Sequence, residues 1–558
     1  MSSQSTTPSH GVTNNVADAL VRAFKATGTQ RMFGLPGGGS SLDLIRAGQD
    51  QGLPFVLARH ECAAAMMAAT TAELDGSIGV AIVTKGPGTA NAANGVAHAA
   101  LDRCALAMIT DGFADSLRSY VTHQWYDQQQ FLGPLVKAHS TLIETNVSQI
   151  ESLVAQALAP RRGPVHLELT GAAARASLTS PATGTPPQAA ASATVIGAPD
   201  PEGLITDLKA AKKLIRYARK PVIVVGLEAR DAATTAAVRQ WASSLGCPAL
   251  VTYKAKGVIA DNNPAYAGIF TGGAAEQPVV NEADLIVLVG VDPVELILQP
   301  WPYQTTVLEL SLTQHPVHYT TPACLVTGDL SHSVNALAAE SKQSRWRASK
   351  IKQLRKAAIK ALGYPKVDYG LSPEQVVTVA DKQAAALPVR PRVTVDAGAH
   401  MFSATSFWPC NEPNDLLISN GLASMGFALP AAIAAALHEP QRPVIAFTGD
   451  GGLLMCLGEL ATAAEQQVKV ITIVFNDGAL SLIDIKQQQR ELASDGVRWP
   501  RLDFAGVMKS LGGQGYRVRT ASSYRAALKR AFAYDGPSVI DVIVDPSGYP
   551  AQLRALRG

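Results

Sequence analysis

The chain has 558 residues, of which 47% are hydrophobic and 17% charged, and its formal net charge is +3. Because domains usually hold about 100–200 residues, this length predicts about three of them. The near balance of charge argues against a nucleic acid as the main partner. No run of about 18 uncharged apolar residues occurs and the polar amino-terminal stretch lacks the apolar core of a secretion signal, so we expect a soluble, cytoplasmic protein. The six cysteines are scattered without a Cys-x-x-Cys pair, so they suggest neither a cysteine zinc site nor a disulfide framework.

Short apolar runs alternate with helical stretches in three successive blocks. The expected strands are 31–35, 55–58, 79–84, 106–110 and 165–169 in the first block; 221–226, 248–252, 283–290 and 305–310 in the second; and 392–398, 444–450, 470–475 and 539–545 in the third. Continuous apolar strands separated by helices indicate parallel sheets covered on both faces. We therefore expect an α/β protein with three doubly wound parallel-sheet domains.

The expected domains span residues 12–178, 200–345 and 368–550. A segment rich in Pro, Ala, Ser and Thr at 177–203 separates the first two. A basic helix at 341–360, followed by 363–375, separates the second and third, and we interpret its basic face as exposed to solvent.

Two aspartates each follow an apolar strand of the third block. Asp450 follows the strand that begins at 444, and Asp477 follows the strand 470–475, with a helix expected at about 457–467 between them. In a right-handed βαβ unit both strand ends lie at the same sheet edge, where the two carboxylates can share a cation. Hard oxygen ligands suit Mg²⁺, and Gly449, Gly451 and Gly452 would let backbone N–H groups approach a phosphate. A generic nucleotide-binding turn is the alternative explanation of Gly-Asp-Gly alone.

The spacing of these aspartates also resembles a known motif. The Asp of a Gly-Asp-Gly motif is followed, 27 residues later, by the second residue of an Asn-Asp pair. This pattern is similar to the thiamine diphosphate-binding motif. The chain resembles the group of acetolactate synthases, pyruvate decarboxylases and benzoylformate decarboxylases, most of all acetolactate synthase-like large subunits. The resemblance implies pyrimidine-binding, central and diphosphate-binding domains in that order, with thiamine diphosphate and Mg²⁺ as cofactors. It also implies that Asp450, Asp477 and the backbone carbonyl of Ala479 bind the metal, while Asn476 supports the turn.

The same resemblance assigns roles in the first block. Glu61, at a strand end entering a helix, falls where the family places the glutamate that contacts N1′ of the aminopyrimidine, as a general acid–base group. On its own, Glu61 could instead be a helix N-terminal residue that interacts with the helix dipole. Gly37 and Gly38 belong to a substrate-side loop. Asn91 is expected to start a helix, with a structural role.

Two further residues of this block, His123 and Gln124, fall where relatives line the substrate pocket, although a surface loop is the alternative. In the third block, Ala399 and His400 match the first diphosphate loop. Ala423 and Met425 match the segment beneath the cofactor, where the methionine side chain would hold the cofactor's bent conformation. The arginine that the family would place after the segment VLVGVDP, at 287–293, is missing, which makes a bound FAD doubtful. No coenzyme A or ADP site is evident.

The resemblance implies decarboxylation of a 2-oxo acid followed by carboligation, in which the resulting enamine adds to a second carbonyl compound. The alternative within the family is a non-oxidative decarboxylase that releases an aldehyde; the histidine pair typical of pyruvate decarboxylases is absent from the segment 109–116. A nicotinamide oxidoreductase is disfavoured because no Gly-x-Gly-x-x-Gly follows a strand, and a catalytically silent thiamine-binding relative is disfavoured by Glu61. The resemblance also implies a homodimer or homotetramer with active sites between subunits.

Overall fold

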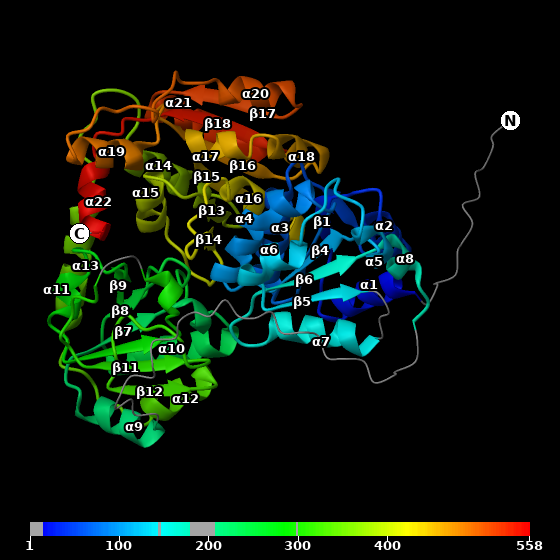
Figure 1. Ribbon diagram of the computed structural model, residues 1–558. Helices are drawn as coiled ribbons and strands as arrows, with labels where there is room; N and C mark the ends of the chain where they lie inside the picture. Colours follow the sequence, from blue (N-terminus) through cyan, green and yellow to red (C-terminus); the bar gives the residue numbers. More distant parts are fainter. Residues whose placement is uncertain (1–14, 143–146, 179–206, 297–299, 558) are drawn as a thin grey trace. The chain divides into compact units, whose positions relative to one another are not determined.

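The computed structural model describes residues 15–142, 147–178, 207–296 and 300–557 (Figure 1). The chain forms two compact units, residues 1–193 and 194–558. Most of the predicted linker at 177–203 lies outside the described residues. Within the described part of the chain, no helix is both long and apolar enough to cross a membrane.

The described strands of the first unit form one parallel six-stranded sheet in the order β2-β1-β3-β4-β6-β5. The strands are β1 (Met32–Leu35), β2 (Phe55–Leu57), β3 (Gly79–Val83), β4 (Leu106–Asp111), β5 (Ala138–Leu142) and β6 (Pro164–Leu169). The helices are α1 (Val16–Ala26), α2 (Ser40–Asp50), α3 (Glu61–Asp75), α4 (Pro87–Leu101), α5 (Asp115–Arg118), α6 (Gln128–Leu132), α7 (Val147–Leu158) and α8 (Gly171–Arg175). Apolar residues of α1 and α7 form one core with the strands, and α3 and α4 lie on the opposite side of this sheet (Figure 1).

The second unit begins with a central sheet in the order β12-β11-β10-β7-β8-β9, again parallel. Its strands are β7 (Pro221–Val225), β8 (Ala249–Val251), β9 (Tyr266–Ile269), β10 (Leu285–Val289), β11 (Val307–Ser311) and β12 (Cys324–Thr327). The helices here are α9 (Leu208–Tyr217), α10 (Ala232–Leu245), α11 (Gln277–Val280), α12 (Leu330–Ala338) and α13 (Ala348–Leu362), with 3-10 turns η2 (Leu227–Ala229) and η3 (Pro293–Glu295). Counted from β7, this order corresponds to 3-2-1-4-5-6, the arrangement of dinucleotide-binding folds.

The C-terminal sheet has the order β14-β13-β15-β16-β18-β17, which repeats the order of the first sheet. Its strands are β13 (Arg392–Val395), β14 (Leu416–Ile418), β15 (Val444–Gly449), β16 (Val470–Asn476), β17 (Gln514–Val518) and β18 (Ser538–Ile543). The helices are α14 (Pro373–Ala384), α15 (His400–Phe407), α16 (Ala428–His438), α17 (Asp450–Met455), α18 (Glu459–Glu465), α19 (Ser481–Gln489), α20 (Phe504–Ser510), α21 (Ala521–Ala533) and α22 (Tyr549–Arg557).

The expected fold class is confirmed, since three parallel six-stranded sheets flanked by helices are present among the described residues. Every run predicted as a strand contains one. The described residues add β5, β9, β12, β14 and β17, all at sheet edges. The helix expected at about 457–467 is present as α18, and the structure adds the short helix α17, which begins at Asp450 and ends before a turn that contains Gly458, a poor helix former. The basic helix, expected at 341–360, begins at Ala348 and ends at Leu362.

Candidate active site

A cavity of about 250 Å³ opens at the carboxyl ends of β13, β15 and β16. The chain order reverses between β13 and β15, so the cavity lies at the topological switch point, where open α/β sheets bind ligands. Its lining includes every residue that the sequence predicted for the cofactor or the metal: Ala399, His400, Ala423, Met425, Gly449, Asp450, Gly451, Gly452, Asp477 and Ala479. These residues come from four separate segments of sequence, which the fold brings to one sheet edge.

Two carboxylates face each other at this edge. Asp450 is the first residue of α17, and its Oδ1 and Oδ2 accept hydrogen bonds from the backbone N–H groups of Gly451 (2.9 Å) and Gly478 (2.8 Å). Asp477 follows β16 directly; its Oδ1 accepts from the N–H of Ala479 (3.2 Å) and its Oδ2 from the hydroxyl of Ser481 (2.6 Å). Both side chains are thus held in place by short loops at strand ends.

The electrostatics of this pair fit a divalent cation. Burial, together with the negative charge of Asp477, raises the pKa of Asp450 to about 7. Burial raises the pKa of Asp477 to about 6, although the hydrogen bond from Ser481 opposes the shift. Two neighbouring carboxylates that resist ionisation in this way become stable as anions when a cation lies between them.

A closely packed glycine and a buried histidine lie beside the two aspartates. A Cβ atom built on Gly452 would lie 2.3 Å from Oδ2 of Asp396, so this position has room for glycine only. His400, at the start of α15, packs against the ring of Phe475, and its Nε2 atom is buried with no hydrogen-bond partner among the described residues. Burial lowers the pKa of His400 to about 4, so the ring is neutral and can donate a hydrogen bond from one nitrogen. An unsatisfied buried donor and a glycine-lined surface fit a bound diphosphate.

The segment that carries Ala423 and Met425 is fastened by Asp396. The carboxylate of Asp396, just after β13, accepts hydrogen bonds from the N–H groups of Gly426 (3.1 Å) and Phe427 (3.2 Å) and from the hydroxyl of Thr448 (2.8 Å). Ala423 has a φ of 54°, an uncommon conformation for a residue with a side chain. Asp396 therefore joins three loops of the pocket wall.

Several residues of the site were not identified from the sequence. Asp396 and Ser481 hold other site residues, as described above. Tyr549 and Arg557 reach the cavity from α22, the C-terminal helix. Ser481, at the start of α19, follows Asp477 by four residues, and this spacing is the one signal that could have revealed it.

In the first unit, Glu61 is the first residue of α3 and is largely buried. Its Oε2 accepts a hydrogen bond of 3.1 Å from the side-chain amide of Asn91. The expected position of Asn91 at a helix start is wrong, because α4 already begins at Pro87 and Asn91 lies one turn inside it. From this position inside α4, the side chain of Asn91 reaches the carboxylate of Glu61, the candidate catalytic residue.

The substrate-side residues lie in two different environments. Gly37 packs closely on Asp111 and Thr84, where a Cβ atom would clash at 2.3 Å, whereas Gly38 faces open space. His123 and Gln124 lie exposed in a loop, and Gln124 has a φ of 58°. The buried glutamine of this stretch is Gln128, whose Oε1 accepts from the N–H of Gly86 (3.1 Å) and whose amide donates to the carbonyl of Asp111 (3.1 Å).

Three family models match consecutive parts of the chain. Residues 14–131 match the thiamine pyrophosphate enzyme N-terminal TPP binding domain, residues 208–337 the central domain and residues 396–542 the C-terminal TPP binding domain. The chain belongs to the thiamine diphosphate-dependent enzymes. The pocket with Asp450 and Asp477 lies in the part that matches the C-terminal domain model, and Glu61 in the part that matches the N-terminal one.

Curated relatives of this thiamine diphosphate enzyme align over nearly its whole length. It is 28% identical to the acetolactate synthase of Bacillus subtilis, covering 96% of this chain and 94% of that protein. It is 26% identical to the catabolic acetolactate synthase of Raoultella terrigena, covering 97% of each. It is 27% identical to the large subunit of acetolactate synthase isozyme 2 of Escherichia coli, covering 95% of this chain and 96% of that subunit.

Proposed function

We propose that this enzyme uses thiamine diphosphate and Mg²⁺ to decarboxylate a 2-oxo acid and to join the remaining fragment to a second carbonyl compound, as acetolactate synthases do. The observation that carries the proposal is the pair Asp450 and Asp477, held at neighbouring strand ends in a pocket that also contains His400 and Met425. The names of the curated relatives favour carboligation over simple release of an aldehyde.

In this proposal Asp450, Asp477 and the backbone carbonyl of Ala479 hold the Mg²⁺ ion. Gly478 and Ser481 keep the two carboxylates oriented, since each donates a hydrogen bond to one of them. The N–H of Ala399 and Nε2 of His400 bind the diphosphate, and Gly452 leaves room for the carboxylate of Asp396 behind it. Ala423 and Met425, on the segment fastened to Asp396, contact the ring system. When bound, thiamine diphosphate supplies a nucleophilic thiazolium carbon and accepts the electron pair that CO₂ leaves behind.

Glu61 is the catalytic acid–base residue in this proposal. Its Oε1 holds a proton for the ring nitrogen N1′ of the aminopyrimidine, while Oε2 accepts from Asn91, which fixes the orientation of the carboxyl group. Asn91 is thus a positioning residue. Gly37, Gly38, His123 and Gln124 remain the proposed substrate-side positions in the same unit.

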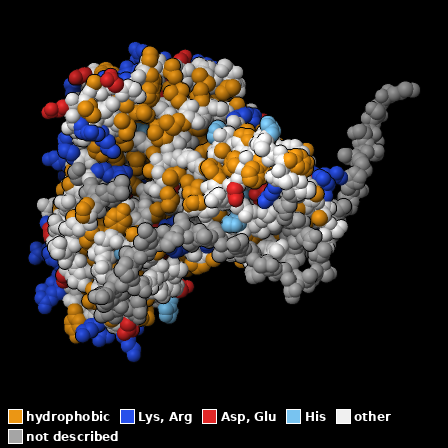
Figure 2. All heavy atoms as spheres, viewed as in Figure 1, with side chains coloured by type: hydrophobic (Ala, Val, Ile, Leu, Met, Phe, Trp, Pro, Cys, Tyr) orange, Lys and Arg blue, Asp and Glu red, His pale blue; other side chains and the backbone are white. Residues whose placement is uncertain are grey.

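We further propose a homodimer or homotetramer, in which Glu61 of one subunit serves the pocket of another. Hydrophobic side chains cover much of the visible surface of the C-terminal domain in the upper part of the view (Figure 2). Among the exposed residues are Met455, at the end of α17, and Ile483, which also lines the pocket. Exposed apolar side chains beside a binding site are typical of surfaces that another chain covers.

The test is a panel of 2-oxo acids, with pyruvate first, assayed with thiamine diphosphate and Mg²⁺. The proposal predicts CO₂ release together with a 2-hydroxy-3-oxo acid as the ligation product. Stoichiometric aldehyde in place of that product would show a non-oxidative decarboxylase instead. Absence of CO₂ release from every 2-oxo acid, with thiamine diphosphate demonstrably bound, would refute the proposed reaction.

A further inference from the structure

The central domain has a switch point of its own, between β7 and β10, where the strand order reverses. The loops that follow these two strands meet directly there, since the N–H of Glu228 donates to the carbonyl of Gly290 at 2.9 Å. Gly290 has a φ of 62°, and a Cβ atom on it would lie 2.8 Å from the backbone nitrogen of Ala229. Sheets of this order bind ligands at this position.

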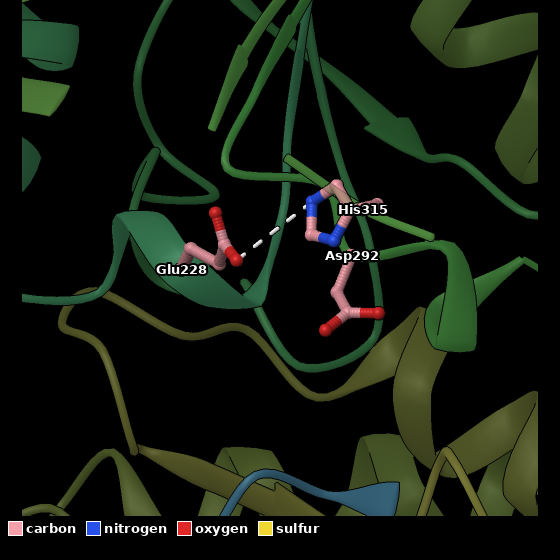
Figure 3. Close-up of side chains that lie close together, drawn as sticks. All are labelled: Glu228, Asp292 and His315. Atoms are coloured by element: carbon pink, nitrogen blue, oxygen red, sulfur yellow. Dashed lines mark ion pairs between the residues drawn. The ribbon is translucent and has the colours of Figure 1, made fainter. Parts of the chain in front are cut away.

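Three side chains of types that can bind a metal lie close together on these loops (Figure 3). Glu228 lies in η2 after β7, Asp292 directly precedes η3 after β10, and His315 follows β11. One ligand atom from each side chain lies within 4.8 Å of the other two. Nε2 of His315 is 3.8 Å from Oε1 of Glu228. Asp292 and His315 are 1% and 2% exposed and the side chain of Glu228 is 6% exposed, so the ligand atoms are largely buried.

The charge of the surroundings favours a cation. Glu309, on β11, places Oε1 3.9 Å from Nε2 of His315 and Oε2 3.5 Å from Nδ1 of His318. The carboxylates of Glu228, Asp292 and Glu309 bring negative charge into a buried region, where a cation would stabilise it. The same carboxylates would repel the phosphates of a nucleotide.

The carboxylates are also oriented by the backbone. Oε2 of Glu228 accepts from the N–H of Leu312 at 2.8 Å, and Oδ1 of Asp292 accepts from the N–H of Val294 at 3.0 Å. Hydrogen bonds of this kind fix metal ligands in proteins. At bond lengths of about 2.0–2.2 Å to zinc, two ligand atoms of a tetrahedral site lie roughly 3.3 Å apart. Nε2 of His315 and Oε1 of Glu228, now 3.8 Å apart, would therefore need to approach each other by about half an ångström.

We propose that Glu228, Asp292 and His315 bind one divalent transition-metal ion at the switch point of the central domain. One imidazole and two carboxylates form a donor set that suits Zn²⁺. Because the cluster is buried, the ion is structural: it joins the loops after β7, β10 and β11. The site is separate from the proposed Mg²⁺ site in the C-terminal domain and does not take part in the reaction.

A zinc-binding experiment on the full-length protein tests the proposed site. The protein is treated with EDTA and then exposed to Zn²⁺ in excess Mg²⁺, without thiamine diphosphate. After gel filtration, mass spectrometry of the metal should find about one zinc per chain in the wild type and at least about fivefold less in His315→Ala and Asp292→Asn. Zinc should also raise the melting temperature of the wild type, but not that of Glu228→Gln.

Two controls separate this site from other zinc ligands. His332→Ala removes an exposed histidine on α12, and Asp450→Asn changes the other carboxylate site; both should retain the wild-type zinc content. A wild type without zinc, or zinc contents equal to that of the wild type in folded His315→Ala and Asp292→Asn, would overturn the proposal. If the cluster variants do not fold, the melting temperature of the wild type decides, and no increase with zinc would also overturn it.

Discussion

The N–H of Gly478 donates a 2.8 Å hydrogen bond to Oδ2 of Asp450, which connects the ends of β15 and β16. Gly478 directly follows Asp477, so the same loop presents one candidate metal ligand and fixes the other. Since β15 and β16 pair in register from Val444 to Gly449, this geometry depends on the sheet and not on a flexible loop.

Magnesium binding should strengthen as pH rises. The folded-state pKa values of about 7 for Asp450 and about 6 for Asp477 lie above the ordinary aspartate value of about 3.9. Because Mg²⁺ requires both carboxylates ionised, we expect its apparent affinity at pH 5.5 to be about tenfold or more below that at pH 8. Titration of Mg²⁺ against melting temperature, at fixed thiamine diphosphate, measures this.

Without metal, the same two groups should give the opposite dependence. A raised pKa means that the folded protein binds more protons than the unfolded chain between about pH 4 and 7, so the contribution of these two groups to stability falls as pH rises through that window.

In Asp450→Asn the stabilisation by Mg²⁺ should be absent both at about pH 5.5 and at about pH 8. A variant that keeps the wild-type response to Mg²⁺ would contradict the assignment of Asp450 as a ligand.

Replacing Glu61 by Gln should abolish turnover while thiamine diphosphate still binds. The amide cannot exchange a proton with the cofactor, and positioned acid–base groups typically contribute about 10²–10⁴-fold to the rate. The measurements are CO₂ release and cofactor titration by fluorescence quenching. Glu151→Gln, an exposed change on α7, is the matched control and should leave both unchanged. Unaltered turnover in Glu61→Gln would refute the mechanism.

Asn91→Ala should lower kcat by about tenfold, because Oε2 of Glu61 then loses the neutral donor that orients it. A purely structural role would change the melting temperature alone. The positioning role predicts in addition a displaced pH profile of kcat, with the Kd of thiamine diphosphate unchanged. Asn94→Ala, about one turn further along α4, is the control, and an equal loss of kcat there would argue against a specific role.

Gly452→Ala should damage the pocket through sterics. The added Cβ would lie 2.3 Å from Oδ2 of Asp396, and overpacking of this kind costs about 1–3 kcal/mol. Displacement of Asp396 would also loosen Gly426 and Phe427, so binding of thiamine diphosphate should weaken. Thermal unfolding and cofactor titration test this against Gly133→Ala, whose new methyl group meets nothing within 4 Å. Wild-type values in Gly452→Ala would show that the close approach is not a constraint.

Arg557→Leu should raise the Kd of thiamine diphosphate about tenfold, as expected for the loss of a charged hydrogen bond. Arg557 is the one Lys or Arg among the described residues that line the pocket, and it lies over the ring of Phe402 on α15, the helix that begins at His400. Arg554→Leu, on the exposed side of the same helix, should change little. A higher KM for the 2-oxo acid with an unchanged cofactor Kd would place the substrate carboxylate at Arg557 instead.

Interior strands could be predicted from the sequence, and most edge strands could not. Runs such as 444–447 and 470–475 are almost entirely apolar because both faces of an interior strand are buried. Edge strands such as β17, with the sequence QGYRV, and β5, with AHSTL, are covered less and carry polar residues, so their periodicity is weak.

By itself the sequence determined the class of the fold and the residues at strand ends that line the cofactor pocket, because short motifs such as Gly-Asp-Gly fix local backbone geometry. Only the tertiary structure decided which distant side chains meet: Asn91 with Glu61, Asp396 with Gly426, Arg557 with the pocket, and Glu228 with Asp292 and His315. These contacts depend on helix starts, strand order and register, which a single sequence encodes only through the packing of the whole domain.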